Sequence, residues 1–146
     1  MTPLVRRYIK TAFVFLLLGM LLGGYLTFEV NVRGRGAPWP LVTAHVHLLL
    51  VGFVLMLIVG VATWMFPRPA RDDRRYRPWV AELIYWLLTV STAIRALGEL
   101  GSAAAGVRGG SVLAALGGFG QVAATLAFVG NMWVRVRMPP AAPPPR

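Results

Sequence analysis

Cysteine is absent from this chain of 146 residues, and histidine is almost as rare, with only two copies. The missing cysteine excludes disulfide bonds, thiolate metal ligands and cysteine nucleophiles. Acidic residues are also scarce, five against fifteen lysines and arginines, which gives a net charge of +10. The basic residues lie at the ends of apolar runs, so no soluble domain remains that would bind nucleic acid.

Long apolar runs are what the sequence has in abundance, since 57% of its residues are hydrophobic. Four runs are long enough and poor enough in charge to cross a bilayer as helices. We therefore expect one all-α domain over residues 1–137, a polytopic membrane protein with four transmembrane helices, followed by a disordered proline-rich cytoplasmic tail over 138–146. The four predicted spans are 11–28, 41–66, 79–97 and 111–134.

Glycine marks the places where helices should pack closely. Gly19 and Gly23 form a small-xxx-small pair in the first span, and Gly117, Gly118 and Gly120 make part of the fourth span slim. The glycine- and alanine-rich stretch 98–110 is predicted to be a loop. Glu29 is expected to close the first span.

The arginines also predict orientation. Positive charge is enriched in the cytoplasmic segments of inner-membrane proteins. The N-terminus, the loop between the second and third spans and the C-terminus are rich in basic residues, whereas the opposite side has Arg33, Arg35 and Arg108. We expect a multi-pass protein of a bacterial or archaeal inner membrane with both termini cytoplasmic, in contact with lipid.

The two histidines, His45 and His47, both lie in the second span. An ionisable side chain is unfavourable in hydrocarbon, so a ligand or proton role is a reasonable first hypothesis. Residues two apart on a helix point about 200° from each other. The second span therefore presents one imidazole to each of two opposite sides, close to the outer face of the membrane.

Heme suits such a pair, because its iron takes imidazole nitrogens axially and its propionates need cations near the membrane surface. Gly52 shares the face of His45 and would leave room for a ring edge, while Val54, Ile58 and Met65 share the face of His47. Cations and aromatic residues at a similar depth could meet the propionates or pack at the rim: Arg33, Arg35, Arg95, Trp39 and Tyr25.

Simpler interpretations stay open for the same residues. Each histidine could hydrogen-bond a backbone carbonyl of a neighbouring helix and bind nothing. Arg95 could extend its side chain to the membrane surface or pair with Glu99 one turn later.

The second span also carries a more specific pattern: Ala44-His45-Val46-His47, then Gly52-Phe53, then Trp64-Met65-Phe66-Pro67. This pattern resembles the tenth span of the heme–copper oxidase subunit I superfamily, which includes nitric oxide reductases. In that span the first histidine binds the high-spin heme and the second binds the low-spin heme on the opposite side. The superfamily's second span has a histidine in the position of His45, and it is the other axial ligand of the low-spin heme.

The resemblance implies an assembly that one chain cannot form alone. The superfamily's twelve-span subunit consists of three similar four-helix arcs, and this chain resembles one arc. Three copies would imitate the whole, each b-type heme being held by His45 of one copy and His47 of its neighbour. The heme type is open.

The departures from the superfamily matter as well. With two histidines, a three-histidine copper site cannot be built within one chain, so no copper is expected, and reduction of oxygen or nitric oxide by the superfamily's mechanism is not expected. We expect a cytochrome-like electron-transfer protein with bis-histidine heme, an unknown redox partner and no catalytic residues. The alternatives are a gas sensor or heme carrier with five-coordinate iron on His45, and a cofactor-free assembly subunit of a respiratory complex.

Overall fold

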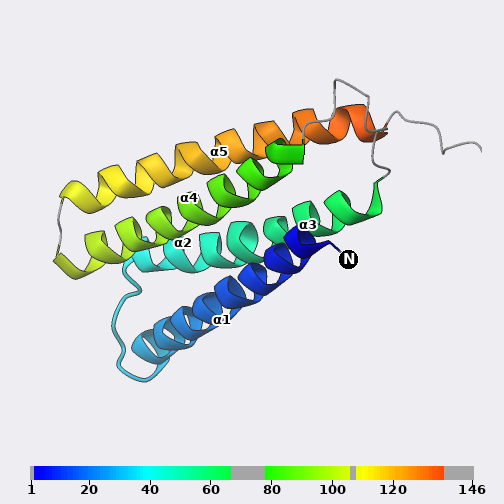
Figure 1. The fold of residues 1–146 in the computed structure, drawn as a ribbon. Helices are drawn as coiled ribbons and strands as arrows, with labels where there is room; N and C mark the ends of the chain where they lie inside the picture. The colour runs from blue at the N-terminus through cyan, green and yellow to red at the C-terminus, as the bar shows by residue number, and fades with distance from the viewer. Residues whose placement is uncertain (1, 67–77, 106–107, 137–146) are drawn as a thin grey trace, which may run out of the picture.

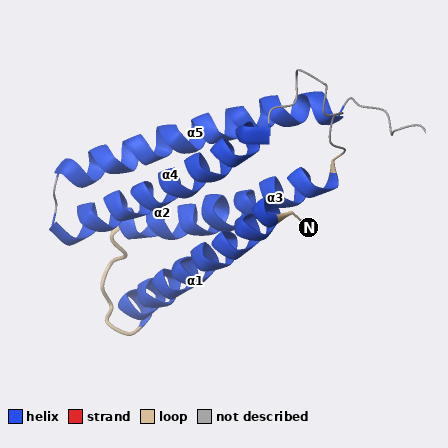
Figure 2. Ribbon diagram, viewed as in Figure 1, coloured by secondary structure: helices blue, strands red, loops and turns tan. Residues whose placement is uncertain are grey.

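The computed structural model describes residues 2–66, 78–105 and 108–136. Nearly all of them are helical (Figure 2), and the described residues include no β-strand. The basic loop 68–77 and the predicted tail 138–146 lie outside the described residues. The helices are α1 (Pro3–Asn31), α2 (Trp39–His47), the π-helix η1 (Leu48–Leu55), α3 (Met56–Met65), α4 (Pro78–Ala105) and α5 (Arg108–Val136).

Four of the helical rods are long and apolar enough to cross a membrane, because α2, η1 and α3 follow one another without a break. The prediction of an all-α, four-span membrane protein is therefore confirmed. Each rod runs antiparallel to the one before it, so the first turn of α1 and the last turn of α5 lie at the same end of the molecule (Figure 1).

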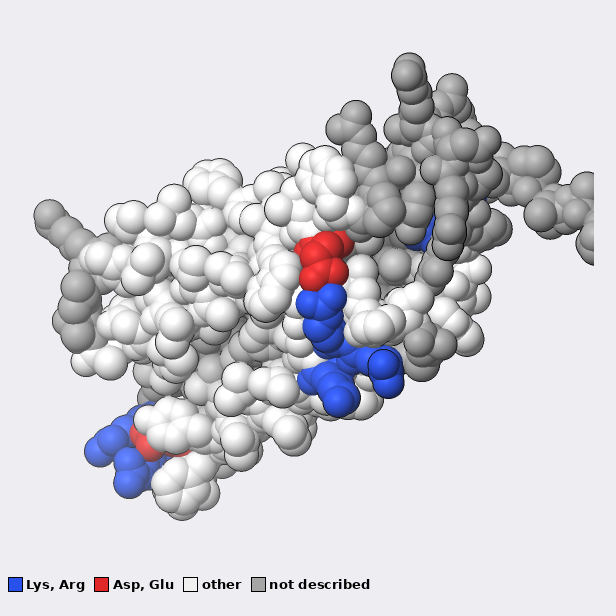
Figure 3. Space-filling view, in the orientation of Figure 1, with Lys and Arg blue, Asp and Glu red and all other residues white. Residues whose placement is uncertain are grey.

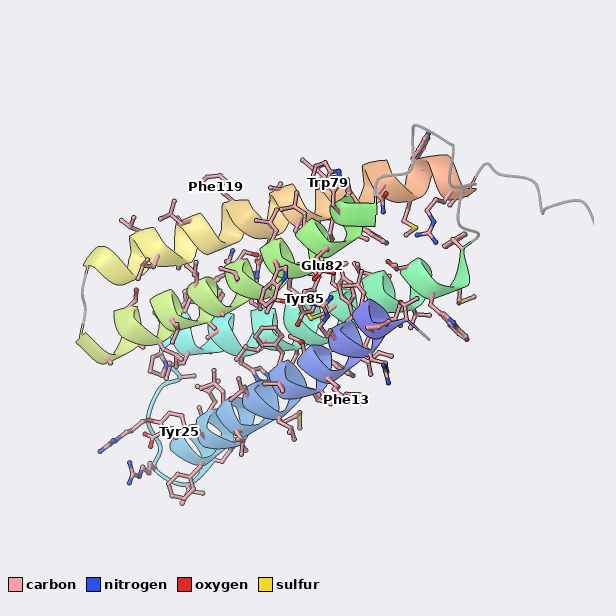
Figure 4. The ribbon with its side chains drawn as sticks, in the orientation of Figure 1. Phe13, Tyr25, Trp79, Glu82, Tyr85 and Phe119 are labelled. Atoms are coloured by element: carbon pink, nitrogen blue, oxygen red, sulfur yellow. The ribbon has the colours of Figure 1, made fainter. Side chains whose placement is uncertain are left out.

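The rods pack in chain order. α1 lies against the rod α2–η1–α3, that rod lies against α4, and α4 lies along α5 (Figure 1). Within the described residues, α1 and α5 share no extensive interface, so the bundle is open between them. Many large apolar side chains consequently face outward; Figure 4 shows Phe13 on α1 and Phe119 on α5 pointing away from the bundle. In a bilayer these side chains contact lipid or another subunit.

Where α1 packs against the second rod (α2–η1–α3), large side chains of each lie against glycines of the other. Tyr8 and Phe15 of α1 lie against Gly60 and Gly52, where an added Cβ would come within 2.7 Å and 2.8 Å of those side chains. In the other direction, Gly19 and Gly23 of α1 receive side chains of the second rod. The predicted close packing at the Gly19–Gly23 pair is thus confirmed, because only a residue without a side chain permits such contact.

A polar clasp holds α1 to α4 near their N-terminal ends. Arg7 binds Glu82 through two N–O contacts of 2.7 Å, and Thr11 shares a hydrogen bond of 2.9 Å with Tyr85. Figure 4 shows Glu82 and Tyr85 on the α4 side of this contact, and Figure 3 shows the basic and acidic groups touching there. Beyond the clasp the two helices diverge (Figure 1), leaving an apolar cavity of about 350 Å³ between them.

Three sequence-based expectations need correction. Residues 98–105 and 108–110 of the predicted loop are helical, because α4 continues to Ala105 and α5 begins at Arg108. The small residues of this stretch instead let the two helices touch, since a Cβ on Gly98 would lie 2.5 Å from the backbone nitrogen of Ala114. Glu29 does not end the first helix, which continues to Asn31, and the carboxylate of Glu29 pairs with Arg33 and Arg35.

The third correction concerns η1. The face predicted for His47 assumes a regular α-helix, but residues 48–55 form a π-helix, a rare form with wider turns that is frequent at functional sites. Its register changes which residues follow His47 along one face. Val51 and Leu55 line the same groove as His47, whereas the predicted neighbours Val54 and Ile58 do not line it.

Candidate functional site

The two histidines lie on opposite sides of the second rod, as the spacing predicted. His45 faces α1, where its ring atom Cε1 lies 2.6 Å from the position that a Cβ on Gly23 would take. His47 faces the other way, into a groove beside α4 and α5. Both side chains are partly buried. The two imidazoles of one chain therefore cannot bind a common ligand.

Each imidazole is fixed by one hydrogen bond to a backbone carbonyl. Nδ1 of His45 lies 2.8 Å from the carbonyl oxygen of Gly19 on α1, and Nδ1 of His47 lies 2.8 Å from that of Thr43, one turn earlier on its own helix. A carbonyl oxygen only accepts, so Nδ1 carries the hydrogen in both rings and Nε2 is the nitrogen with the lone pair.

The bond of His45 to Gly19 matches the simpler interpretation, in which a histidine bonds a carbonyl of a neighbouring helix, whereas His47 bonds a carbonyl of its own helix. Neither bond excludes ligation. Among the described residues, no protein group bonds Nε2 of either ring. Histidines that bind metals commonly donate their other N–H to a carbonyl or carboxylate, which fixes the tautomer and the ring orientation. The same contacts that satisfy the rings therefore leave each one in a form able to coordinate iron.

We call the space beside His47 the His47 groove. It has a volume of about 360 Å³, and its lining comes from three rods: His47, Val51 and Leu55; Arg95 of α4; and Gly118, Gln121, Val122, Thr125 and Leu126 of α5. Val122 and Leu126 are largely exposed at its edge. The groove is thus an apolar trough with a few converging polar groups, the usual character of a cofactor site.

Arg95 lies across the slim part of α5. Its backbone and Cβ lie against Gly117, and its Nη1 lies 2.5 Å from the Cβ position of Gly118. Its Nε donates to Glu99 at 3.0 Å. The predicted pairing of Arg95 with Glu99 is confirmed, and the glycines predicted to make α5 slim are what accommodate the arginine.

The other predicted site residues are not gathered at one place. Arg33 and Arg35 both bind Glu29, at 2.9 Å and 3.5 Å, beyond the C-terminal end of α1. Trp39 begins α2 and is 78% exposed. The room predicted beside Gly52 is filled by Phe15 of α1, which lies 2.8 Å from the Cβ position of Gly52, so no ring edge fits there within one chain.

Sequence reasoning missed three contributors. Gln121 and Gly118 line the His47 groove, and Glu99 places an oxygen 3.8 Å from Nδ1 of His47. A signal existed for Gln121, because an amide in the middle of a membrane span requires a polar partner; it donates to Thr92 at 3.2 Å. The described residues contain no group of three His, Cys, Asp or Glu side chains arranged to hold a metal ion.

Fold and site together define a multi-pass, all-α membrane protein with two separated, pre-oriented imidazoles. The chain matches no known protein family, no curated protein and no solved structure.

Proposed function

We propose that this chain binds b-type heme between copies of itself, with His45 of one copy and His47 of the next as axial ligands. One observation carries the proposal: both rings donate Nδ1–H to a backbone carbonyl and keep Nε2 free, on opposite sides of one helix. A neutral imidazole in this tautomer is the form that coordinates iron.

The opposed histidines favour a ring of copies. Each copy has two different half-sites, so an intact site joins the His45 side of one copy to the His47 groove of another. Repeated head-to-tail contacts of this kind close into a ring when the rotation between neighbouring copies divides a full turn. We favour a homotrimer, in keeping with the resemblance of residues 44–67 to a superfamily built from three four-helix arcs.

The residues present fit a flat, apolar macrocycle with two acidic arms. The His47 groove has mostly aliphatic walls, and Arg95 lies within it. Arg33 and Arg35 retain exposed side chains, with 51% and 68% of their surfaces accessible, at the end of the molecule where the second rod begins. Arg95, Arg33 and Arg35 would bind propionates, and Trp39 would pack at the rim.

Heme supplies reversible one-electron chemistry. Two histidine ligands leave the iron no open position for a substrate, so electron transfer across or along the membrane is the function that fits best. The backbone carbonyls of Gly19 and Thr43 would hold the imidazoles in a fixed tautomer, and the apolar side chains of the His47 groove would keep water from the iron. The inner membrane of a bacterium or archaeon, with both termini in the cytoplasm, is the location that the arginine distribution favours.

The test is complementation between two ligand variants produced in heme-supplied cells. His45→Ala and His47→Ala should each lose the sharp reduced bands of six-coordinate heme when expressed alone. Coexpressed in equal amounts, they should regain about one quarter of the wild-type bis-histidine signal, because a random head-to-tail ring pairs an intact His45 with an intact His47 at that share of interfaces.

Other outcomes would contradict parts of the proposal. A six-coordinate spectrum that persists in His47→Ala would show that the ligand pair is wrong. Failure of the coexpressed variants to regain the bis-histidine signal would contradict a heme site shared between two copies. A spectrum that shifts with carbon monoxide in the unmodified protein would indicate five-coordinate iron and a sensor or carrier, and no Soret band at all would leave a cofactor-free assembly subunit.

A further inference from the structure

Glu99 is bonded differently from the other glutamates that the structure describes. It is 5% exposed, and its Oε2 is buried without a hydrogen-bond partner, while Oε1 alone accepts from Nε of Arg95 at 3.0 Å. The other described glutamates place both oxygens against arginine, Glu82 against Arg7 and Glu29 against Arg33 and Arg35. A buried carboxylate with only one of its two oxygens hydrogen-bonded is unfavourable in a membrane span.

Oε1 of Glu99, the oxygen that accepts from Arg95, lies beside His47. Oε1 is 3.8 Å from Nδ1 of His47, whose hydrogen bond to the Thr43 carbonyl is 2.8 Å long. One carboxylate oxygen thus meets both Nε of Arg95 and the N–H end of the imidazole. His45 has no matching anion in the part of the chain that the structure describes, where its Nδ1 meets the neutral carbonyl of Gly19.

The packing of α5 fixes this oxygen in place. Gly117 lies against the backbone of Arg95 and Gly118 against its Nη1, so α5 contacts both the backbone and the guanidinium of Arg95. Arg95 in turn holds Oε1 of Glu99. The carboxylate is therefore pre-positioned by close helix packing rather than by chance contact.

We propose that Glu99 is a positioning residue for His47, acting through Nδ1–H to make Nε2 more electron-rich than Nε2 of His45. A carboxylate near the N–H of a ligating imidazole raises the basicity of that ligand. The two axial ligands of each heme would then differ in basicity. The more basic one, His47, would favour the ferric state of the iron. The consequence for heme rests on the function proposed above, whereas the effect on the imidazole does not.

The first test needs no heme. With only two histidines in the chain, ¹⁵N NMR of the imidazoles in detergent-solubilised, heme-free protein gives one set of signals for each ring. Glu99→Gln should shift the Nδ1 and Nε2 signals of His47 and leave those of His45 unchanged. Glu82→Gln, which removes an equal charge on the same helix, should change neither. Because Glu99→Gln leaves the partly buried Arg95 without its carboxylate partner, the double variant Arg95→Gln/Glu99→Gln is measured as well.

The second test measures the midpoint potential of the heme-loaded protein. Glu99→Gln should raise the midpoint potential by about 59 mV or more, which corresponds to at least a tenfold change in the ferric–ferrous equilibrium for one electron. Glu82→Gln should leave the potential unchanged. Unchanged His47 signals in both the single and the double variant would overturn the proposal. Shifted His47 signals in a protein that takes up no heme would instead overturn the proposed function and leave the Glu99–His47 interaction standing.

Discussion

At the scale of single residues, two adjacent glycines on α1 have different roles. A Cβ on Gly23 would lie 2.6 Å from Cε1 of His45, whereas a Cβ on Gly24 would meet nothing within 4 Å. The first glycine makes room for the histidine, and the second faces away from the bundle. The difference between them permits a matched test of how the His45 half-site is built.

Gly23→Ala should push the His45 ring from its place, weaken its bond to the Gly19 carbonyl and destabilise the protein by about 1–3 kcal/mol, as overpacking does. Gly24→Ala should be neutral or stabilising by up to about 1 kcal/mol, since alanine favours helix over glycine. Unfolding in mixed detergent micelles measures both, and imidazole NMR follows the ring. Equal stability of the two variants would argue against the tight contact.

The candidate site could be predicted from the sequence only in part, and the residues show why. That His45 and His47 point apart follows from the helical repeat, so it was predictable. That Phe15 fills the space at Gly52 was not, because those residues lie far apart in the sequence and meet only when α1 docks. The role of Glu99 was equally hidden, since its pairing with Arg95 is a local feature and its approach to His47 is not.

At the scale of helices, α4 and α5 form the tightest pair in the molecule. Gly117 lies so close to α4 that a Cβ there would come within 2.6 Å of the backbone nitrogen of Arg95. Backbone cannot move aside as a flexible side chain can. Gly130, further along α5, has nothing within 4 Å.

Gly117→Ala should therefore separate α4 from α5 and cost about 3 kcal/mol or slightly more, at the upper end of what overpacking causes. It should also loosen Arg95 and widen the His47 groove. Gly130→Ala is the control and should be neutral or slightly stabilising. Denaturation by sodium dodecyl sulfate followed by circular dichroism measures the free energies, and a fully stable Gly117→Ala would show that the pair packs less closely than described.

Helix existence was predictable, but helix length was not. An apolar run in a bilayer has no stable alternative to helix, because every backbone polar group must be satisfied within the segment. The helices then extend past the apolar runs, as α4 does through Gly98, Gly101 and Ser102 to Ala105, because contact with α5 stabilises residues that would favour a loop. The π-helix Leu48–Leu55 likewise has no clear local signal.

At the scale of the whole molecule, the absence of cysteine allows a clean test of orientation. Gly36 lies in the loop between α1 and α2, exposed and with nothing within 4 Å of its Cβ position, and Val136 is exposed at the end of α5. The two positions lie at opposite ends of the bundle (Figure 1). A single cysteine at either one reports one side of the membrane.

In intact spheroplasts, Gly36→Cys should react with a membrane-impermeant maleimide, and Val136→Cys should react only after lysis, because the arginine distribution predicts that the termini are cytoplasmic. The unmodified chain, which has no cysteine, is the control for background labelling. The reverse pattern would show that the orientation is wrong, while labelling of both in intact cells would contradict a four-span topology.

The sequence by itself determined the class of molecule, four membrane helices with two imidazoles on opposite sides of one of them. Those properties depend on local rules, the satisfaction of backbone hydrogen bonds in hydrocarbon and the fixed helical repeat. Tertiary structure alone decided which groups of other helices meet each imidazole, the Gly19 carbonyl for His45 and the groove with Glu99 for His47. The physical reason is that these partners come from other helices, and close packing between glycines and large side chains selects them.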